Sequence, residues 1–139
     1  MEYRRFGQVF VIRLGVGDEV VARLGEVCAK ENVRLASVSG IGATDRVRIG
    51  LFDPTKRTYD ETVLTGPMEI VSLLGNVTEK DGAPFPHLHV AVADERFAVH
   101  GGHVFECRIS VACEIVLTSI DGRVGRRIDP ELGVNVLDF

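Results

Sequence analysis

The sequence predicts an α+β fold, a compact and largely antiparallel mixed sheet of about seven strands with one main helix. Apolar residues recur at helical spacing in only one segment, from about residue 19 to about residue 30. Elsewhere they alternate with polar residues or form short runs of strand length. Most connections between these runs are short, which is typical of antiparallel pairing. The strand–helix–strand opening could add one parallel pair.

The first strand is expected at residues 8–14, where apolar residues alternate loosely before Gly15-Val16-Gly17 ends the pattern. Asp18 is a suitable N-cap for the helix that follows. One face of that helix, which should end near Asn32, carries Val20, Val21, Leu24, Val27 and Cys28.

Strand patterns fill most of the remaining chain. The turn Asp53-Pro54-Thr55-Lys56 predicts a hairpin between its two flanking strands, and Asp121-Gly122 predicts a later turn. The tail from residue 123 to residue 139 is expected to be irregular, with room for one more short strand. The expected strands after the helix are 33–38, 46–52, 57–64, 68–77, 87–93 and 104–119.

Length and composition indicate a single globular domain over residues 1–139, with a core from about 5 to 119 and a tail from 120 to 139. No apolar run approaches the roughly 18 residues that span a membrane, and no signal-peptide pattern follows the first residues. We therefore expect a cytoplasmic protein with no membrane partner. Cys28, Cys107 and Cys113 form no Cys-x-x-Cys pair, which predicts buried free thiols.

The net charge of −4 and the isoelectric point of about 5.5 disfavour a grip on nucleic acid through overall charge. Arg123, Arg126 and Arg127 form a small cluster in the tail, but nearby acidic residues predict a solvated surface of mixed charge. The glycines near residues 15–17 and 40–42 lack the spacing of dinucleotide or phosphate loops, so they predict turns.

Three histidines provide the strongest functional signal. His87 and His89 stand in Pro86-His87-Leu88-His89, and alternate residues of a strand point to one side. Their Cα atoms would lie roughly 6.6 Å apart, which lets both rings reach one ion. His103, after Gly101-Gly102, is placed to return on a neighbouring strand. Three neutral imidazoles form the ligand set of an open zinc site, although imidazole also suits nickel, iron or manganese.

The sequence leaves more than one role open for several other polar residues. Glu69 and Glu114 each stand inside an apolar strand, where a carboxylate is costly unless it is paired or functional. They are candidate catalytic bases acting on metal-bound water, and the competing interpretation is a salt bridge, including one across a subunit boundary. His100 is either a further ligand or a loop residue. Gly101 and Gly102 are expected to allow close backbone approach. Asn76 could either cap a bulge or contact the site.

The chain resembles the plants-and-prokaryotes conserved domain, also called PPC or PCC. The resemblance is carried by residues 69–76, by Pro86-His87-Leu88-His89 with the strand after it, by Gly101-Gly102-His103, and by Ser39-Gly40-Ile41-Gly42-Ala43 ahead of them. It covers about residues 5–119. It implies an α+β sheet fold, homotrimers, and zinc held by His87, His89 and His103.

Members of this family are commonly described as DNA-binding, and the plant members carry an AT-hook that enters the minor groove. No Arg-Gly-Arg-Pro segment occurs in these residues, and a trimer of chains at −4 would carry about −12. Two functions follow as hypotheses. One is a homotrimeric zinc-binding module that acts by binding a small ligand or DNA-associated partners. The other is a zinc-dependent hydrolase or lyase acting on a small molecule.

Overall fold

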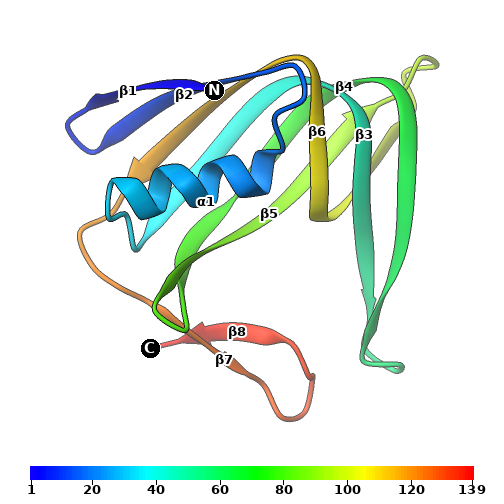
Figure 1. The fold of residues 1–139 in the computed structure, drawn as a ribbon. Helices are drawn as coiled ribbons and strands as arrows, with labels where there is room; N and C mark the ends of the chain where they lie inside the picture. The colour runs from blue at the N-terminus through cyan, green and yellow to red at the C-terminus, as the bar shows by residue number, and fades with distance from the viewer.

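The computed structural model describes residues 1–139 as eight strands and one helix (Figure 1). The fold is therefore α+β in the broad sense, but mostly β. Helix α1 (Val20–Lys30) lies in the chain between the second and third strands. The strands are β1 (Glu2–Phe6), β2 (Val9–Gly15), β3 (Ala36–Asp53), β4 (Thr58–Lys80), β5 (Ala83–Ala93), β6 (Val99–Ser119), β7 (Gly125–Ile128) and β8 (Asn135–Asp138).

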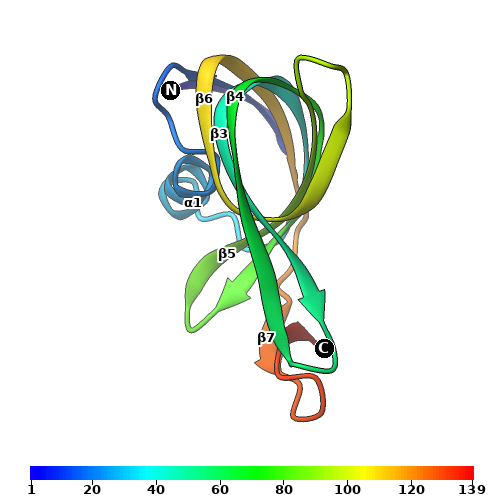
Figure 2. The ribbon, with the colours of Figure 1, turned by 90° about the vertical axis from the view of Figure 1, so that its right-hand side faces the viewer.

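Six strands form one sheet in the order β1-β2-β6-β3-β4-β5. The start of β6 also pairs with β5, so β3, β4, β5 and β6 pair in a closed circuit. Figure 2 shows how strongly the long strands bend to make this closure possible. Strands β7 and β8 form a separate two-stranded hairpin beyond the sheet.

The predicted parallel pair is absent, and every strand pairing is antiparallel. The two strands that flank α1 run in the same direction, but β6 lies between them and pairs with both. β6 is long enough to satisfy the facing backbone groups of β2 and β3 at once, so the mixed-sheet prediction is wrong.

Two predicted strand breaks are also wrong. The segments expected at 33–38 and 46–52 lie largely in one strand, β3, which begins at Ala36, and those at 57–64 and 68–77 lie largely in β4, which begins at Thr58. The pairing of β3 with β4 shifts register between Gly40 and Gly42, and its pairing with β6 shifts between Gly42 and Thr44; both pairings shift again between Thr44 and Arg46. A Cβ atom on Gly42 would lie 2.6 Å from the Cα of Cys113, so this glycine allows close strand approach at a bulge rather than ending the strand.

Helix α1 packs against β5 and β6, and the residues it buries are Val20, Leu24, Val27 and Cys28. The N-cap is Glu19, whose carboxylate accepts hydrogen bonds from the backbone N–H groups of Val21 and Ala22, so the assignment of Asp18 to this position is wrong. All three cysteines are buried and free, as predicted. No helix is long and apolar enough to cross a membrane.

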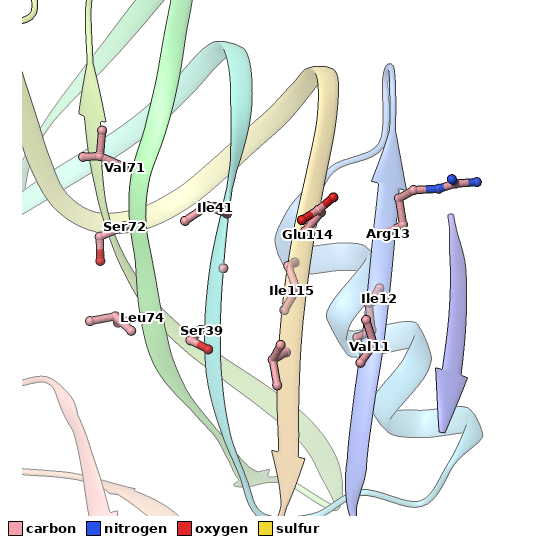
Figure 3. A pocket seen from close by; sticks show the side chains of 12 residues that line it. Val11, Ile12, Arg13, Ser39, Ile41, Val71, Ser72, Leu74, Glu114 and Ile115 are labelled. Atoms are coloured by element: carbon pink, nitrogen blue, oxygen red, sulfur yellow. The ribbon is translucent and has the colours of Figure 1, made fainter. Parts of the chain in front are cut away.

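The face of the sheet opposite the core exposes many apolar side chains. Strand β6 illustrates the alternation, since Cys113, Ile115 and Leu117 are buried while Val116 is 42% exposed. Four side chains of this face, Val11, Ile41, Val71 and Leu74, are labelled in Figure 3. We call it the outer apolar face and define it by Val11, Ile41, Val71, Leu74, Val111 and Val116.

Candidate metal centre

The structure brings His87, His89 and His103 together at the junction of β5 and β6. His87 and His89 lie on the same side of β5, and Leu88 between them points into the core. His103 lies on β6 directly opposite His89 in the antiparallel register. Directly paired residues of neighbouring strands have side chains close together, so the register by itself delivers the third imidazole to the other two.

The three imidazoles are close enough to share one metal ion. One nitrogen from each ring can be chosen so that all three atoms lie within 4.8 Å of one another. The ring centroids are separated by 5.0 to 5.6 Å. The Nδ1 atom of His103 is buried and has no hydrogen-bond partner. Buried polar atoms are almost always paired, so this lone nitrogen fits a missing ligand such as a metal ion.

The surroundings of the rings keep them in the form that binds a metal. Burial lowers the pKa of His87 to about 4, and the nearby Arg126 guanidinium, His103 and His89 contribute to the same shift. Burial also lowers the pKa of His103, with His89 and Arg126 adding to the effect. Both rings are therefore neutral near pH 7, and a neutral imidazole has the free lone pair that coordination requires.

Glycines let the strands approach closely around this site. A Cβ atom on Gly75 of β4 would overlap the backbone carbonyl oxygen of His87 on β5. Cβ atoms on Gly101 and Gly102 would lie 2.7 Å from the carbonyl oxygen of Val90 and 2.8 Å from that of Gly50. The prediction that Gly101 and Gly102 permit close backbone approach is confirmed.

Arg126, from β7, is the residue at this site that sequence reasoning missed, because the tail was expected to be irregular and its arginines solvated. Its guanidinium donates to Thr78 Oγ1 at 2.8 Å, to Asn76 Oδ1 at 2.9 Å and to the Asn135 carbonyl at 3.3 Å. Its Nη2 also lies 3.3 Å from Nδ1 of His87. Asn76 thus contacts the site through Arg126, and the guanidinium connects the β7–β8 hairpin to the histidines.

The histidines line a cavity of about 330 Å³. Tyr59 and Phe85 contribute aromatic rings to its wall, and the Tyr59 ring lies 5.0 Å from the His103 ring. The hairpin closes another side with residues 133–135. The lining residues are Tyr59, Phe85, His87, His89, His103, Arg126, Gly133, Val134 and Asn135.

Glu69 and Glu114 are not among the residues that line this cavity. Both are exposed, and both border a different cavity on the outer apolar face together with Ile41 and Val111. Each carboxylate points out of its strand into solvent, so neither bears the cost of burial that its apolar neighbours in sequence suggested. Neither forms a salt bridge within the chain.

His100 is separate from the three clustered histidines. Its Nε2 lies 3.0 Å from Oδ2 of Asp94, and both residues line a different cavity beside residues 63–68. The His100 contact holds the pKa of Asp94 below its usual value. His100 lies in strand β6 opposite Val92, so the interpretation as a loop residue is wrong, because β6 begins at Val99 to pair with β5.

A strongly bent antiparallel sheet with one helix, carrying three clustered histidines beside a partly buried arginine, defines a small β-rich domain with a candidate metal site. The chain belongs to the Plants and Prokaryotes Conserved (PCC) domain family, whose model matches residues 1–121. The resemblance noted in the sequence is thereby confirmed.

Solved structures of similar proteins agree with this assignment. A candidate DNA-binding protein from Bacteroides thetaiotaomicron is 28% identical and superposes with a TM-score of 0.96, covering 99% of this chain and 96% of its own. The metal-containing protein AF0104 from Archaeoglobus fulgidus is 33% identical with a TM-score of 0.90, over 99% and 97%. The bifunctional protein GlmU of a Synechococcus strain is 31% identical over 91% of this chain, but the chain spans only about a fifth (20%) of that protein.

Proposed function

We propose that this protein is a homotrimeric zinc-binding module that captures a small molecule at a three-histidine site. The observation that carries the proposal is the cluster of three imidazoles with one buried nitrogen, His103 Nδ1, that no protein group satisfies. His87, His89 and His103 would hold the ion and leave a position facing the cavity. Similarity to a metal-containing protein supports the binding of a metal ion.

Binding is favoured over catalysis by what surrounds the histidines. A bound zinc ion would supply a Lewis acid, but hydrolysis or lyase chemistry would also need a general base beside it, for which a carboxylate is the usual group besides histidine. The cavity lining contains no aspartate or glutamate. The residues that line it instead bind and orient: Arg126 supplies a positive charge, and Tyr59 and Phe85 supply aromatic walls that exclude water.

Metal content tests the site. Tag-free protein supplied with zinc and then washed should hold close to one zinc per chain by elemental mass spectrometry. The His87→Ala/His89→Ala variant should retain almost none, because one imidazole cannot hold the ion against washing. The variant His100→Ala is the matched control and should bind as much zinc as wild type. Equal and negligible zinc in wild type and in the double variant would refute the site.

The outer apolar face supports the proposed trimer. Ile41 is 57% exposed, Leu74 56% and Val111 68%, and contiguous apolar surface of this kind marks association sites. Glu69 and Glu114 border the same surface, where a partner chain could supply the positive charge that each lacks within this chain. In the proposed trimer, Glu69 and Glu114 would therefore form salt bridges across the subunit boundary.

Light scattering coupled to size exclusion tests the trimer. Wild type should have three times the 15.2 kDa mass of the chain. The variant Ile41→Asp should shift the mass toward a monomer, because a carboxylate buried without a partner in an apolar interface is strongly unfavourable. Val16→Asp is the control, since Val16 is 77% exposed but lies between β2 and α1. A wild-type monomer would refute the trimer.

A further inference from the structure

Arg126 is a partly buried cation without an anion. The other arginines that the fold partly shields each form a salt bridge with a carboxylate; these are Arg23, Arg34, Arg46 and Arg48. The contacts of Arg126 are a hydroxyl, an amide oxygen, a backbone carbonyl and an imidazole nitrogen, all of them neutral. A shielded charge is normally compensated by an opposite one, so the site lacks a negative group.

The cavity as a whole repeats this imbalance. Its lining residues include three histidines and one arginine but no acidic residue. A divalent ion on the histidines would bring the local charge to about +3 in a partly closed space. Charge–charge interactions in such a space are stronger than in water, so the site would favour an anionic occupant.

Two further groups define the occupant. A guanidinium has five N–H donors, and the four contacts of Arg126 leave one N–H on Nη1 without a partner. The Oδ1 atom of Asn135 is buried at the same cavity and has no hydrogen-bond partner, so it needs a donor. The rings of Tyr59 and Phe85 border the remaining space and suit a carbon skeleton rather than an inorganic anion.

We propose that the cavity binds a small hydroxycarboxylate, with its carboxylate against Arg126 and its hydroxyl toward Asn135. This inference rests on the proposed function, since it names the class of molecule captured beside the metal. Arg126 is the residue that selects an anion, and the β7–β8 hairpin is the element that delivers Arg126. The volume of about 330 Å³ fits a molecule of a few carbon atoms.

Cobalt(II)-loaded protein provides the test, because the visible absorption of cobalt reports changes at the site without any need for turnover. Glycolate and its neutral analogue glycolamide are titrated into wild type. Glycolate should change the cobalt absorption at a concentration at least about tenfold lower than glycolamide does. Arg126→Gln should bind cobalt but weaken glycolate binding by about tenfold or more, the usual loss for a hydrogen bond to a charged group. Arg127→Gln is the matched control, because Arg127 is an exposed neighbour on β7 that pairs with Asp138, and it should bind glycolate like wild type.

The outcomes separate the two proposals. Failure of wild type to take up cobalt, measured before any glycolate is added, overturns the metal site and this inference with it. Normal cobalt uptake with equal responses to glycolate and glycolamide, or equal glycolate binding by Arg126→Gln and Arg127→Gln, overturns the hydroxycarboxylate alone. Tighter binding of inorganic phosphate than of glycolate overturns it as well. If Arg126→Gln loses cobalt, Arg126→Lys replaces it in the comparison; because lysine keeps the positive charge, this variant should still respond to glycolate at a lower concentration than to glycolamide, and equal responses to the two would overturn the proposal.

Discussion

Gly75→Ala is expected to destabilise the fold by about 3 kcal/mol or more and to release the metal. The added methyl group would overlap the His87 carbonyl oxygen and lie 2.9 Å from the Cα of Leu88. Both obstacles are backbone atoms of β5, so no side chain can move aside to make room. The two strands must separate, and the shift falls on the residue pair next to His87.

Thermal unfolding followed by circular dichroism, at one fixed protein concentration, measures this effect, and a fall in the melting temperature of roughly 10 °C is expected. Zinc content should fall in the same variant because His87 moves with its strand. Gly25→Ala is the matched control. Gly25 lies within α1, and a Cβ atom there would meet no other atom within 4 Å, so alanine should stabilise the helix by about 0.5–1 kcal/mol. A Gly75→Ala protein that melts like wild type would contradict the close approach of β4 and β5.

Local sequence patterns predicted the helix and the positions of most strands, because burial on one side imposes a period that the sequence shows directly. They failed where tertiary pairing overrides the local signal. Glycines at positions 40 and 42 have the composition of a turn, yet they lie in a continuous bent strand because β6 approaches them closely. Strand β1 was missed since its sequence, Glu-Tyr-Arg-Arg-Phe, is largely polar and lies at the sheet edge, where little is buried.

The candidate site likewise contains residues that local sequence patterns could place and one that they could not. His87 and His89 could be placed together from their spacing, and His103 from its position after two glycines. Arg126 could not, because it reaches the site from a hairpin whose two strands are only four residues long. Its contacts with Asn76 and Thr78 span about 50 residues (50 and 48) of sequence, and a local pattern does not encode such distances. For Glu69 and Glu114 the local pattern was misleading. Their apolar neighbours in sequence suggested that both carboxylates are buried, but the outer face of these strands is itself apolar, and both carboxylates are exposed on it.

Asp18→Asn is expected to lower the free energy of unfolding by about 2 kcal/mol near pH 7. Asp18 is buried, and its carboxylate accepts a hydrogen bond from the backbone N–H of Gly15 at 2.9 Å and one from Arg23 at 2.8 Å. The Met1 amino group lies 3.0 Å from the same carboxylate. The Gly15 hydrogen bond, with the contributions of that amino group and of Arg23, lowers the pKa of Asp18 to about 2.

The sign and the pH range of this contribution follow from that pKa. A carboxylate whose pKa is lower in the folded state stabilises the fold above its unfolded value of 3.8, and the stabilisation is lost as the pH falls toward about 2. Urea unfolding at a fixed protein concentration should therefore show a large difference between wild type and Asp18→Asn at pH 7, and little difference at pH 2. Glu26→Gln removes the exposed partner on the other side of Arg23 and should cost less than about 1 kcal/mol at either pH. A difference for Asp18→Asn that stays constant from pH 7 to pH 2 would mean that its charge contributes nothing and that only its shape is needed beside α1.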